Sequence, residues 1–250
     1  HTNQERLYQN MPAKELKDKT KIYQKFNEIV GVSQSVVASF TKFFESLPAV
    51  HLYNPLNEQI ITERSELPLN KRMNVKPYFI TVGRLIPIKG YDRLISALAT
   101  LKKENYDFNL IIVGDGFKRL FLEDFAAKQG VSENIIFYGH ADNPYPLIKN
   151  ADLFICSSIQ EGLSTVVTEA LILGVPIVTT HCSGMNELVE NDVTGMICEN
   201  SEEGLYNSIK SILDHPEKFI YFRNNIEKSK SRFFLKTRMA AIESFFELLN

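Results

Sequence analysis

The sequence has little of what marks several large classes of protein. Its formal net charge is −2 over 250 residues, so the basic balance of an electrostatically driven nucleic-acid binder is missing. No hydrophobic run reaches membrane-spanning length, because the longest candidate, Ala170 to Val178, is interrupted by Gly174 and Pro176. The apolar content of 44% and charged content of 23% instead indicate an ordinary globular protein with chain enough for a large core.

Patterns that bind metals or form disulfides are also scarce. The three cysteines, Cys156, Cys182 and Cys198, form no CxxC pair and lie at or near the ends of expected strands. We interpret them as core thiols of a reducing compartment rather than as a zinc or redox site. The sequence contains no Asp-x-Asp pair and no His, Cys and Asp cluster with the spacing of metal ligands, so we expect no bound metal.

The order of segments from Tyr78 onward predicts the fold class. The expected strands are short apolar runs: Tyr78–Val82, Asn109–Val113, Asn134–Tyr138, Leu153–Ser157, Pro176–Thr180 and Thr194–Cys198. The expected helices between them are amphipathic: Tyr91–Glu104, Lys118–Gln129, Leu163–Leu173, Gly184–Glu190 and Ser201–Leu213. Gly130 and Gly174 are expected to end the second and third of these helices. Apolar strands alternating with helices indicate an α/β protein with a doubly wound, Rossmann-like parallel sheet.

Both ends of the chain are expected to lie outside this α/β domain, which we assign to residues 77–231. Residues 1–57 hold enough for a single βα unit, with a Ser33-capped helix, and the polar stretch 58–76 is expected to be a linker. Residues 232–250 form an amphipathic helix candidate that no later strand can receive, so we expect it to cross onto another part of the protein. Because the chain starts at His1 without a signal peptide, we expect a piece of a longer protein or a tagged version of one.

Two basic residues follow the first expected strand. Ligands of parallel α/β sheets bind outside the carboxyl ends of the strands. Arg84 and Lys89 lie in such a loop, and Gly83 and Gly90 let its backbone approach a ligand. The pattern suits a diphosphate, held by these cations and a helix N-terminus rather than by Mg²⁺, although two solvated surface charges would explain it equally. The later VGDG segment, 113–116, is interpreted as a strand-to-helix turn, since a dinucleotide fingerprint would follow the first strand.

The most informative segment is EGLSTVVTEA, residues 161–170. Glu169 is a lone carboxylate in an apolar stretch, and burying it is costly unless it is hydrogen-bonded. A helix that begins just past Gly162 would offer free N–H groups to a phosphate, with Glu161 at the rim of the cleft and Glu169 accepting the two hydroxyls of a ribose. In the competing interpretation Glu169 faces solvent and Glu161 is only an acidic residue at a helix start. His140, after the third strand, is a further candidate to line the cleft.

These segments together resemble a known family. GRL-x-x-x-KG, VGDG, FYGH, ADLFICSS and EGLSTVVTEAL-x-x-GVPIV occur in the order and spacing of the C-terminal, donor-binding domain of retaining glycosyltransferases of family 4 (group 1). That family has the GT-B fold, which consists of two Rossmann-like domains. The resemblance covers Tyr78 to about Leu213. Residues 1–57 resemble the end of the same family's N-terminal acceptor domain, and residues 232–250 resemble its C-terminal crossover helix.

The resemblance implies a role for each matching side chain. Arg84 and Lys89, after Gly83, match the pair that grips the donor diphosphate. Glu169 matches the glutamate that binds the ribose hydroxyls. Glu161 matches the glutamate that lies against the donor sugar and is tied to catalysis.

The resemblance also implies roles for two stretches of backbone. The amides of Leu163, Ser164 and Thr165 match those that hold the phosphates, and Ser164 stands where the family often has a second glycine. Residues around the end of the third strand match the edge that reads the nucleobase: Tyr138, His140 and Ala141.

The implied activity is transfer of a sugar from a nucleotide-diphosphate sugar, expected to be UDP-linked, to a glycan or lipid-linked acceptor, with retained configuration and without metal or other cofactor. The expected setting is bacterial cell-surface polysaccharide biosynthesis in the cytoplasm, including peripheral contact with the inner face of the membrane. A further expected partner is the missing N-terminal domain, which in the family holds the acceptor site and a catalytic His. No nucleic-acid partner is expected.

Other functions are weighed against the same residues. An epimerase of GT-B shape would need extra carboxylates and a His, a phosphorylase would need a pyridoxal lysine, and neither is evident. An NAD-binding domain fails on the placement of its glycines. A non-catalytic nucleotide-binding or assembly module of GT-B shape stays open, and whether the full gene encodes a normal N-terminal domain would discriminate it.

Overall fold

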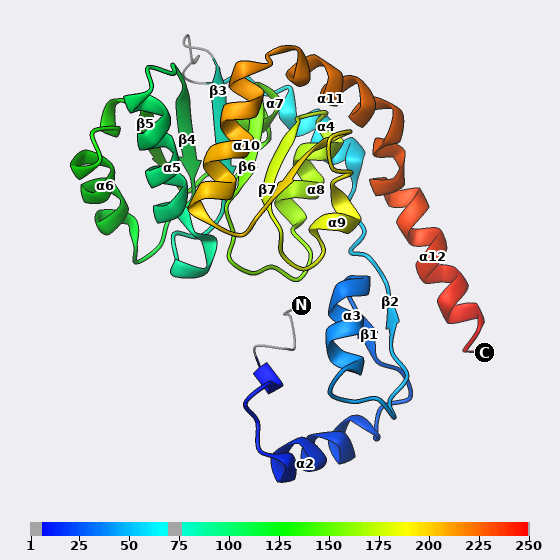
Figure 1. The fold of residues 1–250 in the computed structure, drawn as a ribbon. Coiled ribbons are helices and arrows are strands. Elements are labelled where there is room, and N and C mark those ends of the chain that lie inside the picture. Colours follow the sequence, from blue (N-terminus) through cyan, green and yellow to red (C-terminus); the bar gives the residue numbers. More distant parts are fainter. Residues whose placement is uncertain (1–6, 70–76, 250) are drawn as a thin grey trace.

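The computed structural model describes residues 7–69 and 77–249, which form an α/β body and a smaller front unit (Figure 1). The strands of the body are β3 (Tyr78–Val82), β4 (Asn109–Val113), β5 (Ile135–Gly139), β6 (Leu153–Cys156), β7 (Ile177–Thr180) and β8 (Gly195–Cys198). They form a six-stranded sheet in the order β5-β4-β3-β6-β7-β8, and each neighbouring pair is parallel. The predicted Rossmann-like parallel sheet is confirmed.

Helices cover both faces of this sheet (Figure 1). One face packs against α5 (Tyr91–Lys103), α6 (Arg119–Lys128) and α10 (Glu202–Asp214). The other packs against α4 (Glu58–Ser65), α7 (Tyr145–Lys149), α8 (Thr165–Ile172) and α9 (Met185–Leu188), and α11 (Glu217–Ser229) contributes to both cores. Three short 3₁₀ turns complete the body: η1 (Pro87–Lys89), η2 (Ser132–Asn134) and η3 (Lys230–Phe233).

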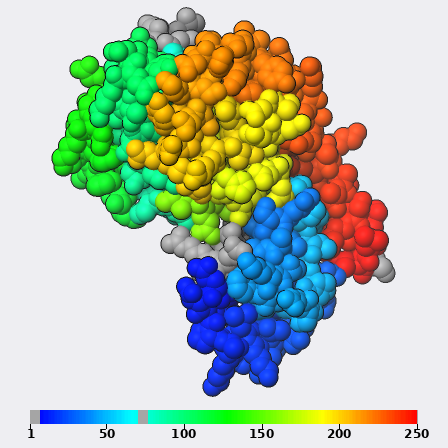
Figure 2. All heavy atoms as spheres, in the orientation of Figure 1, coloured from blue at the N-terminus to red at the C-terminus, as the bar shows by residue number. Residues whose placement is uncertain are grey.

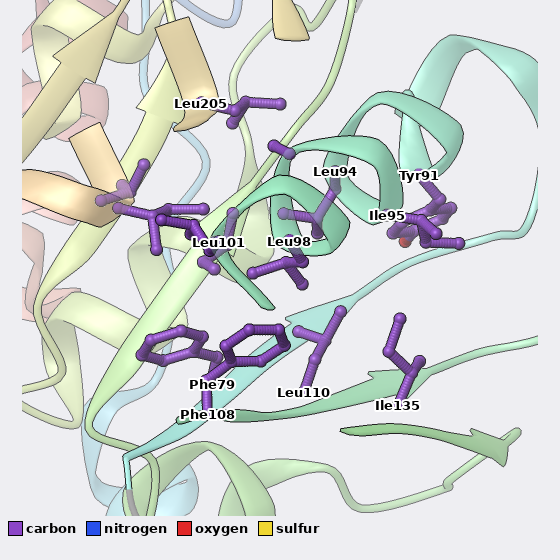
Figure 3. Close-up of a cluster of buried hydrophobic side chains, with 14 of the residues drawn as sticks. Phe79, Tyr91, Leu94, Ile95, Leu98, Leu101, Phe108, Leu110, Ile135 and Leu205 are labelled. Carbon is purple, nitrogen blue, oxygen red and sulfur yellow. The ribbon is translucent and has the colours of Figure 1, made fainter. Parts of the chain in front are cut away.

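The core explains why the strand sequences are apolar throughout. Adjacent residues of one strand enter opposite cores, so Phe79 of β3 packs under α5 while Ile80 packs toward α8. Figure 3 shows Leu94, Leu98 and Leu101, one stripe of α5, above the sheet that carries Phe79. All of these side chains are fully buried. Burying each contributes about 1.5–3 kcal/mol, so both faces of each central strand must be apolar.

The strand order reverses between β3 and β6. The chain adds β4 and β5 on one side of β3, then returns to place β6, β7 and β8 on the other. The loops that leave the carboxyl ends of β3 and β6 therefore diverge to opposite faces of the sheet and leave a crevice between them. Lys89 follows one of these strands and Glu161 follows the other.

The front unit is a separate lobe, drawn in blue in Figure 2. It contains α2 (Ala13–Tyr23), β1 (Val30–Gly31), α3 (Gln34–Thr41) and β2 (Val50–His51), and β1 pairs with β2 in parallel. Its own small core includes Phe40 and Phe44. The predicted cap of α3 is present, because Ser33 Oγ accepts a hydrogen bond from the Val36 N–H at 3.1 Å.

Three parts of the body differ from the sequence-based expectation. Residues 58–65 of the expected linker form α4, since Asn57 caps that helix and Ile61 is buried in the core beside α8; residues 70–76 lie outside the described part of the chain. Helices α7 and α11 were not expected. The C-terminal helix α12 (Leu235–Glu247) leaves the body after η3 and extends beside the front unit (Figure 1). Within residues 7–69 and 77–249, no helix is long and apolar enough to cross a bilayer.

Candidate functional site

The loops at the carboxyl ends of β3, β4 and β5 are held together by backbone hydrogen bonds. The Gly83 N–H donates to the Val113 carbonyl at 2.9 Å, and the Gly114 N–H donates to the Gly139 carbonyl at 2.7 Å. Gly114 has a φ of +134°, and a Cβ there would lie 2.0 Å from the Gly83 carbonyl oxygen. Only glycine fits such a contact. The VGDG segment is therefore the expected strand-to-helix turn, and it fixes the loop that carries Arg84.

Lys89 and Glu161 meet across the crevice between β3 and β6. The Lys89 Nζ lies 2.6 Å from Glu161 Oε1, and the hydroxyl of Ser158 donates to the same oxygen at 2.7 Å. Both charged side chains are largely buried, with 21% and 14% of their surfaces exposed. The turn of η1 and the left-handed Gly90 (φ +61°) direct Lys89 toward this partner. The structure thus brings together the expected diphosphate cation and the expected catalytic carboxylate.

Arg84 lies in the same loop but in a different environment. Its side chain is exposed and makes no hydrogen bond or ion pair with any residue that the structure describes. The preceding Gly83 is close to the buried Tyr91, whose hydroxyl would lie 2.9 Å from an added Cβ. A free guanidinium beside a constrained backbone is available to an anionic ligand without first breaking another ion pair.

The N-terminus of α8 opens onto the same edge of the sheet. The helix begins at Thr165, two residues later than expected, because Leu163 and Ser164 are still in the loop and Ser164 is its N-cap. No side chain caps the first turn. The unpaired N–H groups and the helix dipole there favour an anion. The expected backbone positions, Leu163, Ser164 and Thr165, thus border the helix start.

Glu169 lies about one turn into α8 and is hydrogen-bonded to a tyrosine. The Tyr145 hydroxyl, from α7, donates to Glu169 Oε1 at 3.1 Å. Burial raises the pKa of Glu169 above its usual range, and the hydrogen bond from Tyr145 only partly offsets that rise. Glu169 is thus hydrogen-bonded, as its position in an apolar stretch predicts. Its carboxylate nevertheless has little contact with water. The solvent-facing alternative does not fit this side chain.

The end of β5 and the residues that follow it form an exposed edge. Tyr138 and His140 are exposed, Ala141 is half-buried, and His140 Nε2 lies 3.1 Å from Asp142 Oδ1. Within the described residues, His140 forms no hydrogen bond or ion pair with Glu161 or Glu169. Arg64 of α4 packs over the Tyr145 ring, 5.5 Å from its centroid.

Sequence reasoning missed Ser158, Tyr145 and Arg64. Ser158 follows β6 and Tyr145 follows β5, so the rule that ligands gather at carboxyl strand ends would have pointed to both. Arg64 carries no such signal, because it reaches the site from the segment interpreted as a linker: its guanidinium donates to the Asp142 carbonyl at 2.8 Å. Among the residues that the structure describes, no group of three or more His, Cys, Asp or Glu side chains is placed to hold a metal ion.

Comparison with known proteins places these features in a family. The model of the family described as "Glycosyl transferases group 1" matches residues 64–229. An uncharacterized glycosyltransferase of Haemophilus influenzae is 27% identical over 197 residues, 78% of this chain and 54% of that protein. The N-acetylgalactosamine-N,N'-diacetylbacillosaminyl-diphospho-undecaprenol 4-alpha-N-acetylgalactosaminyltransferase of Campylobacter jejuni is 28% identical over 193 residues, 76% of this chain and 50% of that protein.

The fold is also that of solved GT-B structures. The crystal structure of Anabaena Alr3699/HepE in complex with UDP matches with a TM-score of 0.80 and 22% identity, over 96% of this chain and 69% of that one. The chain spans about half the length of the curated relatives described above. Because the family model covers most of the chain and includes both glutamates and both loop cations, the chain belongs to the group 1 glycosyl transferases.

Proposed function

We propose that this chain is the donor-binding half of a retaining, family 4 glycosyltransferase that takes its sugar from a UDP-sugar. The observation that carries the proposal is the pair formed by Lys89 and Glu161 at the strand-order reversal, with Glu169 on the helix that starts beside it. A nucleotide sugar presents a ribose, a diphosphate and a sugar, and the site offers a carboxylate for the ribose, a cation for the diphosphate and a carboxylate for the sugar.

The geometry supports a division of roles. Exposed Arg84, Lys89 and the uncapped start of α8 would bind the diphosphate, and their charges would stabilise it as it leaves. Glu169, held by Tyr145, would accept the ribose hydroxyls, and the open edge around His140 would hold the base. Side-chain cations and helix N–H groups would then supply the charge that a metal provides in other transferases.

Glu161 is proposed to act at the sugar. In the transfer, the bond between the anomeric carbon and the diphosphate oxygen breaks and its electron pair leaves with UDP. The acceptor hydroxyl forms the new bond from the same face, and its proton passes to the departing phosphate oxygen. Positive charge builds up on the sugar in between, and the Glu161 carboxylate would stabilise it once diphosphate draws the Lys89 charge away.

The proposed acceptor is a glycan or lipid-linked sugar, in assembly of bacterial cell-surface polysaccharide by a cytoplasmic enzyme, with peripheral contact at the inner face of the membrane. The Campylobacter relative, whose name carries an undecaprenol-linked acceptor, supports this setting. The acceptor would bind chiefly to a preceding domain, of which the front unit is proposed to be the end.

Calorimetric titration of the chain with UDP, GDP and ADP tests the proposal. UDP is expected to bind most tightly, and EDTA is expected to leave that affinity unchanged. Absence of binding by all three nucleotides would refute the donor-binding role, and a strict need for Mg²⁺ or Mn²⁺ would refute the metal-free mode.

A further inference from the structure

A second concave site lies on the other side of the loop that carries Glu161. It is a pocket of about 430 Å³ at the carboxyl ends of β6, β7 and β8. Its walls include Ser35, Ile159, Gln160, His181, Asn186 and Asn200. The residues assigned above to the nucleotide come from the loops after β3 and β5 and from the start of α8, and none of them lines this pocket. Its volume is typical of a small-molecule site.

The chemistry of the lining is polar but uncharged. It combines the amides of Gln160, Asn186 and Asn200 with the imidazole of His181 and the hydroxyl of Ser35, and none of its described residues is Asp, Glu, Lys or Arg. A phosphate or carboxylate ligand would be expected to meet a cation. Amides, imidazole and hydroxyls instead pair with neutral hydroxyl groups, which both donate and accept.

Asn200 carries a hydrogen-bond acceptor that lacks a donor. Its Nδ2 donates to the carbonyls of Ile159 at 2.9 Å and His181 at 3.2 Å, which fixes the orientation of the amide. Its Oδ1 is buried and has no donor among the described residues. A buried acceptor left unpaired costs about 1–3 kcal/mol. A hydroxyl that enters the pocket beside Asn200 would supply the missing donor.

The pocket adjoins the proposed reaction centre. Ile159 and Gln160 are the second and first residues before Glu161, so their Cα atoms lie within about 8 Å of its Cα along the chain. The exposed side chain of Ile159, at 45%, offers an apolar surface to the C–H face of a ring. The roof is Ser35 of the front unit, whose Oγ accepts from the Gly184 N–H at 3.0 Å. Part of the pocket wall therefore belongs to the front unit.

We propose that this pocket binds a neutral pyranose ring next to Glu161, with Asn186, Asn200 and His181 as its hydrogen-bonding groups. The inference rests on the proposed function, because it assigns the sugar that the same site handles. The ring can come from two sources: the hexose of the donor or a sugar residue of the acceptor glycan.

Calorimetry and saturation-transfer NMR on the chain test the pocket. The probes are UDP, UDP-linked glucose, galactose, N-acetylglucosamine and N-acetylgalactosamine, and the methyl glycosides of the same sugars with UDP at saturation. The variants are Asn186→Leu, at the exposed rim, and Asn200→Leu; Asn207→Leu, exposed on α10, is the matched control. Circular dichroism confirms folding, and Asn186→Leu remains informative if Asn200→Leu unfolds.

The expected result is at least a fivefold loss of sugar-dependent affinity in Asn186→Leu, with the affinity for UDP itself unchanged. If Asn186→Leu no longer binds a UDP-hexose more tightly than UDP, the pocket holds the donor sugar. If Asn186→Leu instead loses the binding of methyl glycosides, the pocket holds a sugar of the acceptor. The pocket proposal is overturned if UDP binds but no hexose increases the affinity of UDP and no methyl glycoside shows saturation transfer. It is also overturned if both pocket variants bind sugars as tightly as the Asn207→Leu control. Failure to bind UDP would instead count against the proposed function.

Discussion

The ammonium of Lys89 and the carboxylate of Glu161 lie 2.6 Å apart, although the two residues are 72 positions apart in the chain. They meet because their strands are neighbours at the reversal of strand order. In the empty site each neutralises the other. On the proposed function, a diphosphate that binds Lys89 would have to compete with Glu161 for its charge. Its binding would then free the Glu161 carboxylate to act on the sugar.

This pairing predicts a cost to stability when one partner is removed. Lys89→Ala leaves Glu161 largely buried with only Ser158 beside it, so unfolding free energy should fall by about 1–3 kcal/mol. Urea denaturation measures the change. Lys128→Ala is the control, since its pair with Asp124 is exposed and should be worth less than about 1 kcal/mol. Equal effects of the two substitutions would contradict the importance of the Lys89 pair.

Arg84 should behave in the opposite way. Because its guanidinium is exposed and unpaired within the described residues, Arg84→Ala should change stability by no more than about 0.5 kcal/mol. It should still weaken UDP binding by about 1.5–3 kcal/mol, through loss of a charge-assisted contact, while uridine binding is unaffected. Calorimetry with both ligands decides the matter. A parallel loss for UDP and uridine would remove Arg84 from the diphosphate site.

Glu169 separates stability from binding. Burial raises its pKa, so its ionised form destabilises the empty fold at any pH above that raised value. Glu169→Gln should therefore keep or raise the melting temperature, while the loss of two ribose hydrogen bonds weakens UDP by about 2–4 kcal/mol. If Glu169→Gln lowers the melting temperature and leaves UDP affinity unchanged, Glu169 contributes to stability and not to nucleotide binding.

The same residue predicts a pH dependence. Uridine affinity should fall as the pH drops through the raised pKa of Glu169, because the protonated carboxyl accepts fewer hydrogen bonds. Tyr145→Phe removes the one hydrogen bond that lowers this pKa, so its titration should move to higher pH. Glu169→Gln is the control and should show no such step. An unchanged titration in Tyr145→Phe would show that the Tyr145 contact does not act on Glu169.

Glu187 predicts how the front unit docks. Its carboxylate accepts from the N–H groups of Gln34 and Ser35 at the start of α3, at 2.8 and 3.0 Å, and from the Tyr53 hydroxyl at 2.9 Å. Burial raises its pKa, but the hydrogen bond from the Ser35 hydroxyl, together with those from the two N–H groups and Tyr53, outweighs burial, and the net pKa is lowered. The contact therefore stabilises docking fully above the ordinary value of 4.5 and is lost as the pH falls through the lowered pKa.

Hydrogen exchange measures this docking. Glu187→Gln should speed exchange of the Gln34 and Ser35 amides at neutral pH. In the unaltered protein, acid should lower the protection of the same amides relative to their intrinsic exchange rate at that pH. Glu199→Gln, at an exposed position with no ion pair among the described residues, is the control. Full protection in Glu187→Gln would show that other contacts hold the front unit.

Local chemistry explains which parts of the molecule were predictable. Gly130 and Gly174 take the left-handed φ values of +76° and +75° at the ends of α6 and α8, as their positions in the sequence indicate. Helix α11 was missed because among its residues only Phe222 and Ile226 are buried, which is too sparse a stripe to show a period.

The site divides in the same way. The edge that carries Glu161 and Glu169 follows from strand ends and a helix start, which are local signals. The partners of these residues do not, because Lys89 and Tyr145 reach them from distant segments through the strand order. Residue type and position predict that a buried charged side chain requires a hydrogen-bonding or ionic partner. The tertiary topology determines which residue is that partner.

The chain passes between the body and the front unit side by side with its own C-terminal segment. Leu56 bridges to Phe234, the Leu235 N–H donates to Glu58, and Arg238 donates to the Asn54 carbonyl at 2.6 Å. One tether would let the lobe swivel in any direction. Two segments bonded to each other along their length resist twisting and favour bending about a single axis. We therefore expect the front unit to move relative to the body mainly by bending about this axis, which would change its distance from Glu187 and from the proposed sugar pocket.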